Sequence, residues 1–213
     1  LIYSGWENTL VTTGTKMLEY MQDKATIEDV VKQLEDDQES VVNNKPEVIT
    51  TITEVISQEN CAKLVGRCFA QATDSDLALV SLGTWISGNG LNQNNDCVSS
   101  KMYAKDITVD DLSAIIPTGW TRTIQTVSLT GKQIRDLYKE GYDAVGTGNN
   151  YPYVLVSPVE LEDDKTYQVA ISGISEKLAS EVEVTDSGIV GLDAAKEFFG
   201  QFETLSEADA EWK

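Results

Sequence analysis

The sequence contains no histidine and only three arginines. Without histidine, Ser-His-Asp and Cys-His mechanisms cannot be assembled, and neither can most zinc or di-metal hydrolytic centres. The shortage of arginine limits phosphate recognition, because guanidinium is the usual bidentate clamp for phosphate. An anion site would need Arg67, Arg122, Arg135, a lysine or backbone amides. We therefore expect that this chain does not carry out catalysis on its own.

Long apolar runs are also missing, and positive charge is scarce. No segment approaches the ~20 apolar residues that span a bilayer, so we expect no membrane insertion. The chain has 35 acidic against 16 basic residues, a net charge of -19 that repels nucleic-acid backbones. Residue 1 is Leu, and no signal-type segment follows it. The chain is therefore expected to be a piece of a longer or processed protein.

The acidic runs do not have the pattern of a metal site. Residues 34–40 (LEDDQES) and 161–165 (LEDDK) lack the alternating ligand spacing of a calcium loop. We interpret both as solvated acidic surface and expect no cofactor within this chain.

The three cysteines give no disulfide framework. Cys61 and Cys68 lie seven residues apart on one predicted helix, which separates them by roughly 10 Å, beyond disulfide reach. Burial as small apolar residues is the favoured interpretation. A bridge from Cys97 to either one stays open, and the odd count fixes no compartment.

What is present favours one ordinary domain plus a smaller piece: 213 residues, 41% of them hydrophobic. Capping signals at Ser57, Thr108 and Thr130 each precede an amphipathic pattern and predict helices. Alternating or continuous apolar runs predict strands between them. The expected fold is α+β (or α/β), a mixed β-sheet covered by helices. The predicted strands are 10–13, 47–56, 77–82, 123–130, 153–161 and 166–172, and the predicted helices are 26–34, 57–72, 108–116, 131–143, 173–180 and 192–202.

From about residue 48 to 200, the order of motifs resembles the C-terminal domain of the 5′-nucleotidase and UDP-sugar hydrolase family. "DLALVSLG" stands where the family has a strand leading into an Asn-Gly-Gly-x-Arg type turn. "ITVDDLSAIIPTGW" resembles the family's short helix and Leu-Pro-Phe-Gly, and "LTGKQIRDLY" resembles its Leu-Thr-Gly-x-x-Leu helix start. The strand pair "YPYVLVSPVEL" and "DDKTYQVAIS" follows, as it does in the family.

The resemblance implies a division into domains. Residues 1–45 would be the remnant of a preceding metallophosphatase domain plus a linker helix, since "TLVTTGTKM" weakly resembles the last strand of that domain. Residues 46–202 would be the C-terminal-like domain, and 203–213 an acidic tail. The partner would be the N-terminal domain of the same polypeptide, which holds the divalent metals. The family is mostly secreted, surface-attached or periplasmic, and the same location is expected here.

The resemblance also implies that this domain captures a nucleoside, with the base stacked between two aromatics and held by Asn and Arg. At the matching positions, this sequence has other residues than the family's nucleoside-binding ones. Ser81 replaces the Asn, Ile86 the Arg and Thr118 one stacking Phe, while Ile174 stands near the second. Losing these groups would cost about 3–6 kcal/mol, or two to four orders of magnitude in affinity.

Other residues near the same loops could rebuild a site. Trp85 and Trp120 flank the two loops, and Arg122 lies beside Trp120. Tyr151 and Tyr153 come shortly afterwards. Packing is the more ordinary role for the tryptophans, and a surface ion pair is the more ordinary role for Arg122. The candidate ligand-binding residues are Ser81, Gly83, Trp85, Thr118, Trp120, Arg122 and Tyr153.

Two hypotheses follow. In the first, the chain is the substrate-binding domain of a 5′-nucleotidase-like nucleotide hydrolase, with a divergent site for a nucleoside or nucleotide. In the second, it is a degenerate, non-catalytic interaction or structural module of a secreted or surface protein. An autonomous enzyme is disfavoured because histidine is missing. The sequence identifies neither the ligand nor the oligomeric state.

Overall fold

The computed structural model describes residues 29, 31–36, 46–83, 85–86, 90–91, 97–98, 100–116, 123–143, 152–174 and 176–212. The chain divides into two units, Leu1–Pro46 and Glu47–Lys213. In the first unit, residues 31–36 are helical, and Val31 and Leu34 are exposed. The predicted strand at 10–13 and the helix start at Thr26 lie outside the described residues. All elements below belong to the second unit.

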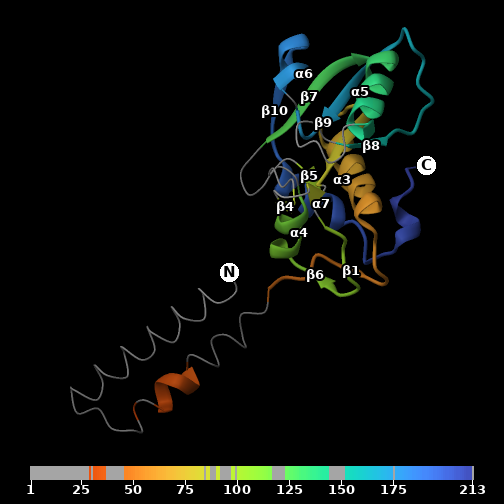
Figure 1. The fold of residues 1–213 in the computed structure, drawn as a ribbon. Helices are drawn as coiled ribbons and strands as arrows, with labels where there is room; N and C mark the ends of the chain where they lie inside the picture. Colours follow the sequence, from red (N-terminus) through yellow and green to blue (C-terminus); the bar gives the residue numbers. More distant parts are fainter. Residues whose placement is uncertain are drawn as a thin grey trace. The chain divides into compact units, whose positions relative to one another are not determined.

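The main sheet is mixed and has six strands in the order β10-β7-β9-β2-β5, with β8 also paired to β2 (Figure 1). Strand β2 runs parallel to β9 and β5 and antiparallel to β8. Strand β7 pairs antiparallel with both β9 and β10. The bounds are β2 Leu77–Leu82, β5 Cys97–Val98, β7 Thr123–Thr130, β8 Tyr153–Val156, β9 Thr166–Ile171 and β10 Val184–Val190.

Helices cover both faces of this sheet. Within β2, Ala78 and Val80 join the hydrophobic cluster that contains α3 (Gln58–Ala72), α4 (Val109–Ile115) and α7 (Gly191–Phe199). Leu77 and Leu79 join the opposite cluster, with residues of α5 (Gly131–Asp143) and α6 (Glu176–Glu181). This two-sided burial explains the continuous apolar run of β2. The predicted fold class, a mixed sheet covered by helices, is confirmed.

The predicted helix starts are confirmed by their capping contacts. The Ser57 Oγ accepts the Asn60 N–H at the start of α3. Asp111 accepts both the backbone N–H and the hydroxyl of Thr108 before α4. Before α5, Thr130 and Gln133 form a reciprocal capping box. Each contact satisfies donors that a helix start would leave unpaired.

Residues 203–212 are not a trailing acidic tail, and that prediction is wrong. Strand β11 (Thr204–Leu205) pairs parallel with β1 (Thr50–Ile52), which also pairs with β6 (Asp106–Ile107). The 3-10 helix η1 (Glu207–Ala210) follows and packs against α3. Leu205 and Ala210 are each 1% exposed, so two apolar side chains fasten the segment although its composition is acidic.

Strand β10 was not predicted, because its sequence contains a turn signal. The carboxylate of Asp186 accepts the Gly188 N–H at 2.8 Å, and Gly188 has a φ of 72°. The pairing with β7 is irregular between Asp186 and Val190, which identifies a bulge. Local composition therefore indicates a loop where tertiary pairing produces a bulged edge strand.

All three cysteines are buried and none of them is in a disulfide, so the bridge from Cys97 does not form. Burial raises the pKa of the Cys61 thiol to about 11 and that of Cys68 to about 12, which keeps both protonated. Their predicted role as small apolar residues is confirmed.

Helix α3 packs closely against the sheet at Gly66. A Cβ at this position would lie 2.6 Å from Val156 Cγ2 and 3.0 Å from Val80 Cγ2. We expect Gly66→Ala to reduce the free energy of unfolding by about 1–3 kcal/mol because the core is overpacked. Urea denaturation measures the loss. The double variant Gly66→Ala/Val156→Ala should lose less than the sum of the two single changes, and strict additivity would contradict the contact.

The carboxylate of Glu207 holds the C-terminal segment on the first turn of α3. It accepts the Asn60 side-chain amide at 2.6 Å and the Ser57 backbone N–H at 3.3 Å. Hydrogen bonds from Ser57 and Asn60 lower the pKa of Glu207 below its ordinary 4.5. The resulting stabilisation is present above pH 4.5 and is lost as the pH falls through the lowered pKa.

We expect Glu207→Gln to be less stable than the wild type at neutral pH. As the pH is lowered, the free energy of unfolding of the variant should fall less than that of the wild type. Urea midpoints measured at several values between about pH 3 and pH 7 test this. The control is Glu203→Gln, which changes an exposed carboxylate on the same segment. Identical pH profiles for the wild type and Glu207→Gln would contradict the assignment.

Candidate functional site

The candidate site lies where the parallel strands β2 and β9 end, the edge at which α/β proteins usually bind ligands. Ser81 in β2 and Ser172 just after β9 are two of the few buried polar residues. The Ser81 N–H donates to Ser172 Oγ at 3.1 Å, and the Ser172 N–H donates to the Leu79 carbonyl at 3.1 Å. The two strand ends are thus joined by hydrogen bonds.

The turn after β9 is held by Tyr153. Gly173 has a φ of 72°, a conformation that residues with a Cβ rarely adopt. The Tyr153 hydroxyl donates to the Gly173 carbonyl at 2.5 Å, and the side chain is only 4% exposed. Strand β8, which lies on the opposite side of β2 from β9, therefore fixes this turn through the Tyr153 side chain.

The turn after β2 is held by Gln58, the first residue of α3. Its amide nitrogen donates to the carbonyls of Gly83 and Val98, both at 2.8 Å. The Leu82 N–H donates to the Pro152 carbonyl, and the Gly83 N–H donates to the Val98 carbonyl. The first residues beyond β2 are therefore fixed to α3, β5 and the start of β8.

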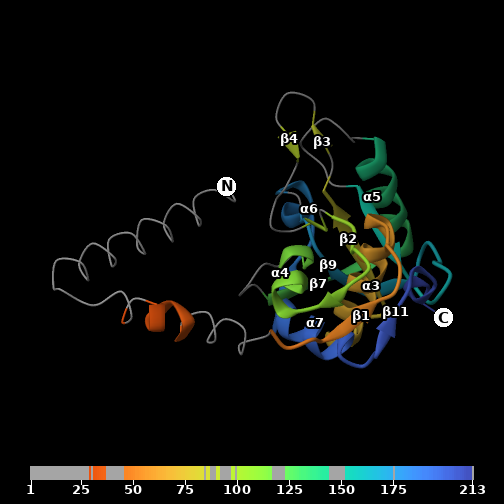
Figure 2. The same cartoon turned by 90° about the horizontal axis from the view of Figure 1, so that it is seen from below.

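Three predicted site residues meet at this edge: Ser81, Gly83 and Tyr153. All three are buried, and their hydrogen bonds go to other parts of the protein. Trp85 lies in β3 (Trp85–Ile86), which pairs antiparallel with β4 (Gly90–Leu91) beyond the end of β2 (Figure 2). Nothing is described of its side chain. Thr118, Trp120 and Arg122 lie outside the described residues.

Sequence reasoning missed Gln58, Ser172 and Gly173 as parts of this edge. Ser172-Gly173, at the end of the predicted strand 166–172, is a turn signal that could have located the second strand end. Gln58 carries no such signal, because a glutamine in the first turn of a helix is ordinary. Only the tertiary position of α3 brings its amide to the turn.

The described part of this edge is electrically neutral. Its polar groups are hydroxyls, backbone amides and one glutamine side chain. Within the described residues, no group of three or more His, Cys, Asp or Glu side chains could hold a metal ion. Because the polar groups are bonded to one another, the described edge can hold the adjoining loops in place.

Comparisons with solved structures identify the fold. The 5′-nucleotidase precursor of Thermus thermophilus aligns over 83% of this chain and 43% of its own, with a TM-score of 0.54 and 14% identity. The NAD nucleotidase of Haemophilus influenzae gives a TM-score of 0.53 at 10% identity, over 85% and 42% of the two chains. The chain has the fold of part of a 5′-nucleotidase.

A putative 5′-nucleotidase from Staphylococcus aureus gives a similar result, with a TM-score of 0.51, 12% identity and coverage of 83% and 43%. No family model and no curated protein sequence matches the chain. The chain spans less than half the length of these structures. The predicted resemblance is confirmed as a shared fold, and the partial coverage agrees with one domain of a larger polypeptide.

The Tyr153 hydroxyl offers a direct test of this edge. We expect Tyr153→Phe to lower the free energy of unfolding by about 0.5–1.5 kcal/mol, because the Gly173 carbonyl loses its donor. Urea denaturation measures the change. The control is Tyr103→Phe, since Tyr103 is 59% exposed and lies in the loop before β6. Equal stability of the two variants would contradict a structural role for the Tyr153 hydroxyl.

Proposed function

We propose that the chain is the substrate-binding C-terminal domain of a 5′-nucleotidase-like hydrolase. The observation that carries this proposal is the fold shared with 5′-nucleotidases over 83% of this chain and only 43% of the Thermus chain. That ratio is what one domain of a two-domain enzyme would give. The order of motifs in the sequence supports the same assignment.

In this proposal, the chemical step belongs to another part of the full-length protein. The chain has no histidine. An N-terminal metallophosphatase domain of the same polypeptide would hold the divalent metals, and this chain would hold the nucleoside part of the substrate. We propose a secreted, surface-attached or periplasmic location, as expected from the resemblance. Among the described residues, no helix is long and apolar enough to cross a membrane.

The proposed ligand contacts the loops at residues 82–88, after β2, and 117–122, before β7. The described residues of this edge carry no charge, so the edge suits a nucleoside base and sugar better than a phosphate. Since Ser81 and Tyr153 are occupied by contacts within the protein, the ligand would need Trp85 and the loop residues Thr118, Trp120 and Arg122. A stacking tryptophan contributes about 0.5–1.5 kcal/mol beyond its buried area, so affinity would be modest.

A second candidate function is an interaction or structural module that kept the fold and lost the ligand. The burial of Ser81, Gly83 and Tyr153 favours it, because none of the three presents a free polar group to a ligand. Under this alternative, the hydrogen bonds at the edge serve only to hold the fold.

Ligand-observed saturation-transfer NMR with adenosine, uridine, AMP and UDP-glucose separates the two candidates. The first predicts transfer to at least one nucleoside, and a loss of at least fivefold in affinity for Trp85→Ala or Trp120→Ala. Tyr103→Ala, which removes an exposed aromatic elsewhere, should bind like the wild type. Absence of transfer at millimolar ligand, with the protein folded, would reject nucleoside capture and leave the second candidate.

A further inference from the structure

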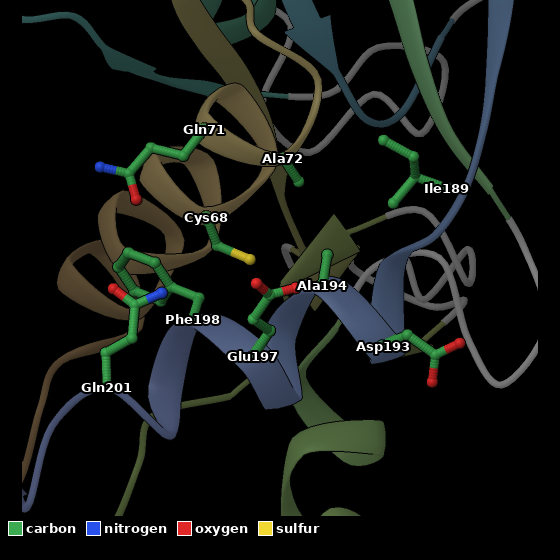
Figure 3. Close-up of a pocket in the computed structure, with 9 residues that line it drawn as sticks. All are labelled: Cys68, Gln71, Ala72, Ile189, Asp193, Ala194, Glu197, Phe198 and Gln201. Atoms are coloured by element: carbon green, nitrogen blue, oxygen red, sulfur yellow. The ribbon is translucent and has the colours of Figure 1, made fainter.

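A pocket separate from the β2 edge lies between α3 and α7 and has a volume of about 420 Å³ (Figure 3). This volume falls within the range of small-molecule sites, roughly 300–1,000 Å³. Helix α3 contributes Cys68, Gln71 and Ala72, and β10 contributes Ile189. The remaining lining residues belong to α7 and the turn after it: Asp193, Ala194, Glu197, Phe198 and Gln201.

The inner part of this pocket is apolar. Ala194 and Phe198 are buried, and Ala72 and Ile189 are half-buried. Cys68 is 1% exposed, and Figure 3 shows its Sγ directed into the space between the two helices. This thiol has no hydrogen-bond partner among the described residues. Such walls accept a short hydrocarbon chain.

The polar part of the pocket carries only negative charge and amides. Asp193 and Glu197 are one turn apart on α7, so they share one helix face. Figure 3 shows the Glu197 carboxylate beside the Cys68 thiol, and its charge adds to the burial that raises the pKa of that thiol. Gln71 and Gln201 add carbonyl oxygens that can accept hydrogen bonds.

Neither carboxylate has a counter-ion in the described part of the chain. No lysine or arginine is among the residues that line the pocket. The nearest arginine in sequence to Cys68 is Arg67, whose guanidinium lies over the rings of Phe198 and Phe202, 5.5 and 6.0 Å from their centroids. The pocket therefore combines an apolar interior with unneutralised acceptors.

We propose that this pocket binds an alkylammonium group, with the hydrocarbon chain on the apolar wall and the ammonium at Glu197. This is the chemistry of a small aliphatic amine and of a lysine side chain. Figure 3 shows the Asp193 carboxylate directed away from Glu197, so Asp193 contributes only longer-range attraction. Both carboxylates are exposed, so they attract a cation, while a neutral molecule gains nothing from them and an anion is repelled. The proposal does not depend on nucleoside capture at the β2 edge.

The experiment titrates the whole ¹⁵N-labelled chain with n-butylammonium and follows backbone amide shifts. Saturable shifts should concentrate in residues 68–72 and 189–201, and binding should weaken as salt is added. The neutral analogue 1-butanol should give much smaller shifts at equal concentration. Nα-acetyl-lysine methylamide is titrated in parallel: tighter binding than butylammonium indicates a protein-borne lysine, and weaker binding a free amine.

Variants at the carboxylates complete the test. Glu197→Gln should weaken butylammonium about two- to fivefold, and Asp193→Asn/Glu197→Gln should weaken it further. Glu59→Gln makes the same charge change at the other end of α3 and should leave the affinity unchanged. Equal binding of butanol, equal binding by the double variant, or no saturable shift in a folded protein would each overturn the proposal.

Discussion

The rest of the structure depends on the burial of β2 between two layers of helices. Its alternate residues supply both hydrophobic clusters, and its two edges pair with β9, β5 and β8. A strand buried on both faces needs apolar side chains at every position, and Leu77-Ala78-Leu79-Val80 meets that need. Where the apolar run stops, at Ser81, the chain emerges at the edge that we propose to be functional.

The polar groups at that edge are used to hold the turns. Ser81 is joined to Ser172, Tyr153 to Gly173, and Gln58 to the carbonyls beyond β2. Each bond satisfies a buried group that would otherwise cost free energy. The consequence for function is that any ligand must be recognised by residues further out on the loops, which the strand ends hold in position.

Most of the fold could be predicted from local signals. The capping residues Ser57, Thr108 and Thr130 locate three helices, because a helix start has to satisfy its own first amides. The apolar run at 77–82 identifies the central strand. What failed depends on distant partners. Strand β10 contains the turn-forming Asp186 and Gly188, and the segment after Phe202 is acidic, yet both pair with strands far away in sequence.

The candidate site was predictable only in part, for the same reason. Ser81 and Gly83 were located by the strand end, but their lack of free polar groups follows from Ser172 and Gln58, which local sequence does not connect to them. The α3–α7 pocket had no sequence signal at all. Its residues repeat at ordinary helical spacing, and only the packing of the two helices leaves a space between them.

Native-state hydrogen exchange tests the central claim most directly, that the edge is a rigid support fixed by its own hydrogen bonds. The amides to compare are those of Ser81, Leu82 and Gly83 with those of Leu77–Val80, deep in β2. We predict that all of them exchange only through global unfolding, with equal free energies of opening. Fast exchange confined to Ser81–Gly83 would contradict the account, because it would show that the edge opens independently of the core.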